Sequence, residues 1–138
     1  MSPLFSKLNL RTQRAIWVLE APASFEPELQ ALYHVTVHRE LSADDQPAFV
    51  LAFAMTQTQL DRISATLVGA TEGDATLWIA YPKGSSRRYR CEFNRDSGWD
   101  VLEKAGFQKV RQVSIDEDWS ALRFRRVAHI GTPPRRPA

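Results

Sequence analysis

The residue types best suited to binding chemistry lie in one turn, Lys83–Ser86, and in the basic run that follows it, Arg87–Arg90. Lys83 supplies an ammonium group, Gly84 supplies a flexible backbone, and Ser85 and Ser86 supply hydroxyls. This chemistry suits a phosphate or carboxylate group held by charge-assisted hydrogen bonds. The turn is not a P-loop, because the spacing G-x-x-x-x-G-K-[ST] is missing. A solvated basic loop is the simpler interpretation, and the sequence favours it over an anion site.

A second turn, Ala21–Ser24, is predicted to lie near the first one, because both follow strands of the same sheet. The run Arg87–Arg90 also has the composition to touch a nucleic-acid backbone while Tyr89 stacks on a base. A net charge of +2 over 138 residues argues against nucleic acid. The sequence leaves the partner unknown, with an anionic small molecule as one candidate. The candidate ligand-binding residues are Pro22, Ser24, Lys83, Ser85, Ser86, Arg87 and Arg88.

No catalytic or metal-binding constellation is predicted. His34 and His38 would lie roughly 13 Å apart on a strand, so one ion cannot bind both. Asp116 and Asp118 are interpreted as turn formers that bond the local backbone rather than as an acid–base pair. Cys91 is the single cysteine, which excludes an internal disulfide and a cysteine-based zinc site. The prediction is therefore no catalytic residue, no metal and no cofactor.

Apolar periodicity predicts the elements that position these residues. Ser24 is predicted to cap one helix, and Thr56 with Gln59 matches a capping box at the start of another. A third helix is predicted after Ser97, ending at Gly106. The predicted strands are Ala15–Glu20, Tyr33–Arg39, Ala48–Met55 and Ala75–Tyr81, and the hairpin strands are Phe107–Ile115 and Trp119–Val127.

This element order predicts a small α/β fold: a doubly wound, Rossmann-like, mostly parallel sheet of about six strands that ends in an antiparallel hairpin. We expect Ala15–Glu20 beside Ala48–Met55, then Leu77–Tyr81, with the hairpin at the outer edge. By analogy, this is a shortened methyltransferase-like fold. Residues 1–130 are predicted to form a single domain, and residues 131–138 a disordered tail.

Ligands of open α/β sheets bind beyond the carboxyl ends of the strands, where Ala21–Ser24, Met55–Gln57 and Pro82–Ser86 should meet. A methyltransferase usually has a glycine-rich turn after its first strand, whereas Ala21–Ser24 contains no glycine. Arg39 also stands where an acidic residue is expected, with Glu40 only adjacent, so S-adenosylmethionine is not predicted.

The leading hypothesis from the sequence is therefore a non-catalytic binding or interaction module on a degenerate methyltransferase-like fold. One alternative is an enzyme or sensor that binds an anionic small molecule at Lys83–Ser86. Another is a weak nucleic-acid binder that uses Arg87–Arg90.

Three segments carry a family resemblance: Val18–Pro22, the strand W-x-x-Y-P-K at Trp78–Lys83, and the hairpin D-x-x-W-S-A-x-R-F at Asp116–Phe124. Together they resemble an uncharacterised bacterial family, a domain of unknown function. The resemblance spans most of residues 1–127. It implies the boundaries of the domain and carries no activity, cofactor or site residue with it.

The composition, 43% hydrophobic and 25% charged, is that of an ordinary globular protein. No stretch approaches the ~20 apolar residues of a membrane span, and the N-terminus lacks the apolar core of a signal peptide, so a bacterial-type cytoplasmic location is expected. The expected assembly is a monomer, or a homodimer through the edge hairpin, where Arg123 and Arg125 would discourage pairing.

Overall fold

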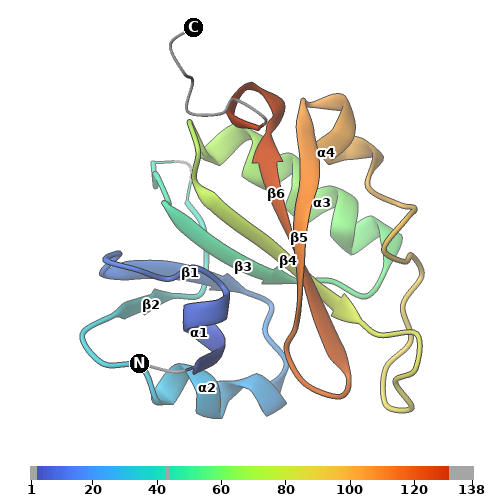
Figure 1. Cartoon of the computed structure of the whole chain (residues 1–138), viewed down its shortest axis with the longest axis horizontal. Helices are drawn as coiled ribbons and strands as arrows, with labels where there is room; N and C mark the ends of the chain where they lie inside the picture. The colour runs from blue at the N-terminus through green and yellow to red at the C-terminus, as the bar shows by residue number, and fades with distance from the viewer. Residues whose placement is uncertain (1–2, 43, 131–138) are drawn as a thin grey trace, which may run out of the picture.

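The computed structural model describes residues 3–42 and 44–130, which form one six-stranded sheet with helices on both faces (Figure 1). The strands are β1 (Ala15–Leu19), β2 (Thr36–His38), β3 (Phe49–Phe53), β4 (Thr76–Pro82), β5 (Phe107–Ser114) and β6 (Trp119–Arg126). The helices are α1 (Pro3–Lys7), α2 (Glu26–Gln30), α3 (Gln57–Ala70) and α4 (Asp100–Lys104).

The strand order is β2-β1-β3-β4-β6-β5. The first four strands in this order run parallel, and β4-β6-β5 is antiparallel. Parallel strands need crossover connections, and here α3 crosses from β3 to β4, whereas a short turn suffices for the β5–β6 hairpin. The predicted α/β class, the mostly parallel sheet and the terminal antiparallel hairpin are confirmed.

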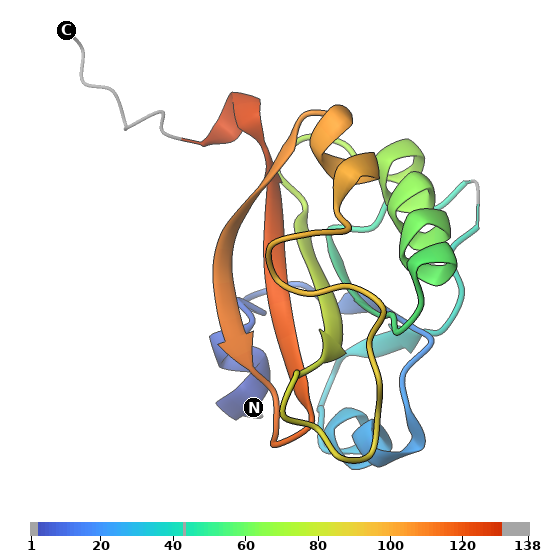
Figure 2. The ribbon, with the colours of Figure 1, turned by 90° about the vertical axis from the view of Figure 1, so that its right-hand side faces the viewer.

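Strand β4 lies at the centre because its side chains are buried on both faces. Leu77, Ile79 and Tyr81 join the core beneath α3 and α4, whereas Trp78 and Ala80 join the core beneath α1 and α2. Figure 2 shows α1 on one side of the sheet and α3 with α4 on the other. The alternation of β4 therefore divides the interior into two apolar layers.

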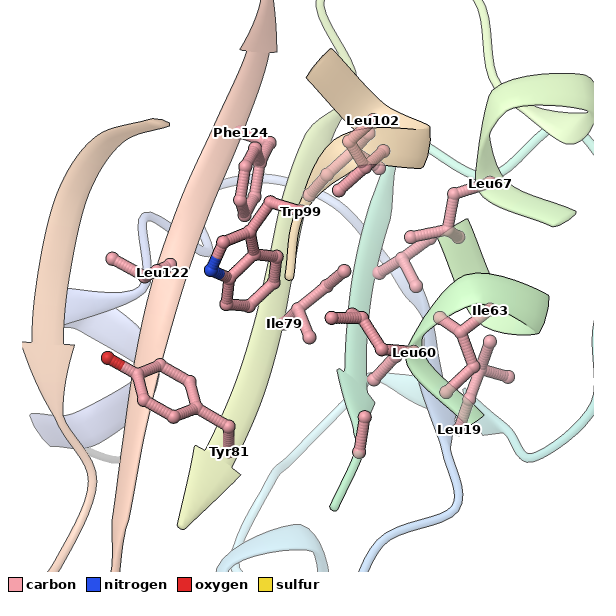
Figure 3. Close-up of a cluster of buried hydrophobic side chains, with 14 of the residues drawn as sticks. Leu19, Leu60, Ile63, Leu67, Ile79, Tyr81, Trp99, Leu102, Leu122 and Phe124 are labelled. Atoms are coloured by element: carbon pink, nitrogen blue, oxygen red, sulfur yellow. The ribbon is translucent and has the colours of Figure 1, made fainter. Parts of the chain in front are cut away.

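The layer under α3 and α4 is built around Trp99, which is 1% exposed. In Figure 3 its ring lies among side chains from β4 and β6, and α3 closes the far side of the cluster. The indole N–H donates to the Asn94 carbonyl at 2.8 Å, so this buried polar atom is satisfied. Trp99 thereby holds the segment before α4 against the sheet.

The first crossover differs from the prediction in its details. Ser24 does not cap a helix: it lies within a 3₁₀ turn, Ala23–Phe25, because the Phe25 N–H bonds the Pro22 carbonyl at 2.9 Å. The short helix α2 follows. The predicted strand Tyr33–Arg39 shrinks to Thr36–His38, because Tyr33 is 78% exposed and His34 adopts φ 60°.

The second crossover follows the prediction closely. Thr56 caps α3, and its hydroxyl accepts a hydrogen bond from the Gln59 N–H at 3.0 Å. In turn, the Gln59 side-chain oxygen accepts a hydrogen bond of 2.7 Å from the N–H of Met55, the residue before the cap. This reciprocal arrangement satisfies backbone donors at the helix start.

Within residues 3–42 and 44–130, no helix is long and apolar enough to cross a membrane. The predicted tail, residues 131–138, lies outside the described residues.

Candidate functional site

The parallel strands bring three loops to one edge of the sheet, as predicted: those that follow β1, β3 and β4. The segment after β4, residues 83–97, folds back over the start of α3. The Glu92 N–H bonds the Met55 carbonyl at 2.9 Å, and the Glu92 carboxylate accepts from the Gln57 N–H at 2.8 Å. Glu92 therefore connects the loops that follow β3 and β4.

A cleft of about 1000 Å³ lies between the segment 83–97 and the β5–β6 hairpin. The sheet contributes Tyr81, Gln112, Ser114 and Ser120 to its lining. The segment 83–97 contributes Lys83, Gly84, Ser85, Ser86, Tyr89, Arg90, Cys91, Glu92, Phe93, Asn94, Arg95 and Ser97, and Pro82 completes the lining. The cleft is thus a mixed polar and aromatic site at the carboxyl end of β4.

Lys83 lies in this cleft but is tied to the hairpin. Its Nζ donates to the Ser114 hydroxyl at 2.7 Å, and its backbone N–H bonds the Asp118 carbonyl at 2.8 Å. Ser85 is exposed in the cleft lining. Lys83 and Ser85 therefore both line the cleft.

Ser86 has a structural role. Its hydroxyl donates to Asp118 Oδ1 at 2.9 Å and accepts from the N–H groups of Arg88 and Tyr89 at 3.2 and 3.1 Å. Asp118 is 8% exposed, so the serine satisfies a buried carboxylate. These bonds join the turn after β4 to the turn between β5 and β6.

The remaining predicted residues lie apart from the cleft. Arg87 and Arg88 are exposed and do not line it, whereas Arg90 and Arg95 do. Pro22 and Ser24 belong to the turn after β1 and are also absent from the lining.

Several cleft residues were not predicted from the sequence, among them Gln112, Ser114 and Ser120. They alternate with apolar residues of the hairpin, which signals one exposed face but not a cleft. Their position depends on how segment 83–97 folds over them. No local pattern in the sequence identifies that fold-back.

Burial raises the pKa of the Tyr81 phenol and of the Cys91 thiol above their usual values. Both groups are therefore neutral near pH 7. The Tyr81 hydroxyl accepts a long hydrogen bond of 3.5 Å from the Gln112 amide. Among the described residues no group of three His, Cys, Asp or Glu side chains is placed to hold a metal. The cleft thus offers neutral hydrogen-bonding groups together with Lys83, two arginines and the Glu92 carboxylate.

A smaller hollow, about 250 Å³, lies where β1 and β2 end beside α3. Glu20 follows β1 in the left-handed conformation, with φ 59°. Its carboxylate accepts from Gln59 Nε2 at 2.7 Å and pairs with Arg62 at 2.9 Å. The hollow is lined by Leu19, Glu20, Arg39, Glu40, Leu41, Arg62, Ile63 and Thr66.

Two charged residues follow β2 in this hollow. Arg39 turns toward α2, where its Nη2 donates to Glu26 at 2.8 Å and its guanidinium lowers the pKa of that carboxyl. Glu40 is exposed and has no hydrogen-bond or ion-pair partner within the described residues. Glu40 is therefore the carboxylate that a ligand in this hollow would meet unpaired.

Neither a protein-family model nor a curated protein matches the chain. The structure is similar to the N-methyltransferase NodS from Bradyrhizobium japonicum WM9, with a TM-score of 0.56 and 13% identity over 89% of this chain and 92% of that one. It is also similar to a SAM-dependent methyltransferase from Aquifex aeolicus, with a TM-score of 0.57 and 14% identity over 88% of this chain and 86% of that one. A possible exported protein from Bordetella parapertussis gives a TM-score of 0.58 and 9% identity over 88% of this chain and 65% of that one.

At these identities the likeness shows the fold alone: a methyltransferase-like Rossmann fold. It corrects the leading hypothesis from the sequence, a non-catalytic interaction module, together with the two alternatives built on Lys83–Ser86 and Arg87–Arg90. Two of these solved structures are methyltransferases that align with 88–89% of this chain, so the fold gives no ground for a non-catalytic assignment. The hypothesis was wrong because it inferred the absence of a catalytic function from the absence of a glycine-rich turn after the first strand.

Proposed function

We propose that this chain is a small S-adenosylmethionine-dependent methyltransferase. The observation that carries the proposal is the similarity of this fold, a mostly parallel sheet that ends in an antiparallel hairpin, to two methyltransferases over most of both chains. Two hollows near the carboxyl ends of β1, β2 and β4 add support. A methyltransferase needs two neighbouring sites, one for the donor and one for the acceptor.

The hollow after β1 and β2 has donor and acceptor groups that suit the cofactor. Glu20 and Glu40 provide carboxylates, which accept hydrogen bonds from ribose hydroxyls or from an ammonium group. Leu19, Leu41 and Ile63 provide apolar surface for an adenine ring. When bound, S-adenosylmethionine would supply an activated methyl group.

The glycine-free turn is compatible with this cofactor for a physical reason. Glycines in a nucleotide-binding turn make the turn tight and let the backbone approach a pyrophosphate. Glu20 already adopts the left-handed conformation, with φ 59°, that turns the chain after β1. S-adenosylmethionine carries no phosphate, so its binding does not require the backbone to approach a pyrophosphate.

The hollow of about 250 Å³ lies below the ~300 Å³ at which ligand pockets commonly begin. We therefore expect the connection directly after β2, residues 39–41, to shift when the cofactor binds. Glu40 lies in that connection, so its environment should change on binding.

The cleft beside β4 is the site proposed for the methyl acceptor. The first turn of α3 joins the two hollows, because Gln59 bonds Glu20 while Gln57 bonds Glu92. In the cleft, Tyr81, Gln112 and Ser120 would bind and orient a polar small molecule, and Phe93 would cover an apolar part of it.

The test is calorimetric titration of the full chain with S-adenosylhomocysteine. We expect saturable binding, weakened about tenfold by Glu40→Gln, as for loss of one hydrogen bond to a charged group. Glu40 is unpaired, so the substitution should leave folding unchanged. Glu103→Gln, an exposed carboxylate on α4, is the matched control and should bind like the wild type.

Absence of both binding heat and a thermal shift at millimolar S-adenosylhomocysteine would overturn the proposal. Equal affinities of the wild type and Glu40→Gln would reject the assigned hollow.

A further inference from the structure

A cluster of arginines lies on the sheet face that carries α1, whereas both hollows lie on the opposite face. Arg111 of β5 and Arg123 of β6 are direct cross-strand neighbours. On one face of an antiparallel pair, such neighbours lie about 5 Å apart at their Cβ atoms. Two positive side chains directly opposite each other are destabilising unless an anion compensates them.

The loop after α1 brings a third arginine to the same place. Asn9, two residues after α1, adopts the left-handed conformation, with φ 67°, and the Leu10 N–H bonds the Phe5 carbonyl at 2.9 Å. After this turn Arg11 contacts Asn9, whose side chain also contacts Arg111 of the hairpin. Helix α1 itself lies on the side of the sheet opposite α3 and α4 (Figure 2). Trp78 fixes the loop, because its indole N–H donates to the Leu8 carbonyl at 2.8 Å.

The acceptors available to these arginines are too few. Asn9 Oδ1 receives both Arg111 Nη1 at 3.3 Å and Arg11 Nη2 at 3.5 Å. Charge-assisted hydrogen bonds are normally about 2.7–2.9 Å long, so both contacts are weak. One neutral amide oxygen thus serves two guanidinium groups.

Arg123 has even fewer hydrogen-bond acceptors than Arg11 and Arg111. Its Nε is buried and has no hydrogen-bond partner within the described residues. The carboxylate of Asp74 is committed to Arg125, at 2.9 and 2.6 Å. Burial lowers the pKa of Arg123, and the neighbouring Arg125 and Arg111 lower it further, while the charge of Asp74 opposes them in part. An unpaired buried donor beside other positive charges is a costly arrangement.

We propose that Arg11, Arg111 and Arg123, with Asn9, form a binding site for a phosphate-type oxyanion. A phosphate group carries up to two negative charges and several acceptor oxygens, which match the N–H donors of the neighbouring guanidinium groups. A single carboxylate would leave positive charge uncompensated. The phosphate is either the free ion or a phosphomonoester of a small molecule. The proposal is independent of methyl transfer, because this face of the sheet holds neither proposed hollow.

The experiment is a titration of the ¹⁵N-labelled full chain at low ionic strength with inorganic phosphate, adenosine monophosphate and acetate. We expect phosphate to shift the amide signals of Asn9, Arg111 and Arg123, and acetate to act more weakly. Tighter binding of adenosine monophosphate would identify a phosphomonoester ligand, and equal binding would identify the free ion.

Arg111→Gln should weaken phosphate binding about tenfold. Arg111 is exposed, so this variant should fold even if Arg123→Gln does not. Lys104→Gln removes the same charge from α4 on the opposite face and should bind like the wild type. Amide signal shifts centred on Lys83–Ser86, or no shift at tens of millimolar phosphate, would overturn the proposal. So would equal weakening of phosphate binding by Arg111→Gln and Lys104→Gln.

Discussion

At the residue scale, most charged contacts of this protein lie at the surface and contribute little to stability. The pair Arg125–Asp74 differs in its geometry, because two parallel hydrogen bonds, 2.9 and 2.6 Å long, join the guanidinium to the carboxylate. It ties β6 to the turn that precedes β4. The Arg125 hydrogen bond lowers the pKa of Asp74 below its usual value.

A carboxyl with a lowered folded-state pKa stabilises the protein above its unfolded pKa, and the contribution is lost as the pH falls through the folded pKa. We therefore expect Asp74→Asn to cost about 0.5–1 kcal/mol near pH 7, because the pair is partly exposed. The difference from the wild type should vanish in acid. Urea unfolding between neutral and acidic pH measures it.

Asp96→Asn is the control, because Asp96 is 81% exposed in its side chain and lies 3.4 Å from Arg95. It should unfold like the wild type at every pH. A deficit of Asp74→Asn that persists unchanged in acid would contradict the assignment.

At the element scale, the ends of helices and loops rest on a few side-chain bonds. The long helix α3 is capped by Thr56, whose hydroxyl accepts a hydrogen bond from the Gln59 N–H. We expect Thr56→Ala to lower the free energy of unfolding by about 1 kcal/mol. Thr58→Ala, an exposed position in the same turn, should have a much smaller effect in the same urea titration. Equal effects would show that the cap contributes nothing specific.

In the segment 83–97, the side chain of Ser86 plays a role similar to that of Thr56 in α3, because its hydrogen bonds hold the start of the segment. Ser86→Ala would leave the buried Asp118 carboxylate without its hydroxyl donor. We expect a cost of about 1–3 kcal/mol and faster hydrogen exchange in the amides of Arg88 and Tyr89. Ser85→Ala removes an exposed hydroxyl next to it and should change neither measurement. Exchange that stays slow in Ser86→Ala would show that other contacts hold the segment.

At the scale of the whole molecule, two apolar layers share one sheet. Leu60 is fully buried in the layer under α3, and Leu8 is fully buried in the layer under α1. Both layers contact β4, whose side chains alternate between them. We therefore propose that the described residues unfold as one cooperative unit.

Leu60→Ala and Leu8→Ala should each lower the free energy of unfolding by about 2–5 kcal/mol. Each should shift one common transition, followed by far-ultraviolet circular dichroism and by tryptophan fluorescence. Val127→Ala, at a position that is 52% exposed, should cost less than about 0.5 kcal/mol. Two separate transitions in either core variant would refute the single-domain proposal.

Local patterns in the sequence were sufficient for the fold class and for most elements, although they misplaced the helix cap at Ser24 and the bounds of β2. The doubly apolar run of β4 predicts a central strand, and Thr56 with Gln59 predicts the start of α3. The predicted role of Asp116 in the turn is confirmed, since its Oδ1 accepts from the N–H groups of Asp118 and Trp119 at 2.8 and 2.9 Å. The prediction for Asp118 was wrong, because its carboxylate accepts from the distant Ser86 hydroxyl instead of the local backbone. Each of the confirmed features depends on residues close together in the chain, where spacing determines geometry.

The candidate sites were decided by tertiary structure. Lys83 was predicted, but its partner Ser114 lies 31 residues away on the hairpin. Glu20 and Glu40 share a hollow because β1 and β2 pair in parallel. Asn9 meets Arg111 across 102 residues. The sequence by itself determined the strands, the helices and their order, whereas these juxtapositions arise from sheet register and loop packing, which no local spacing encodes.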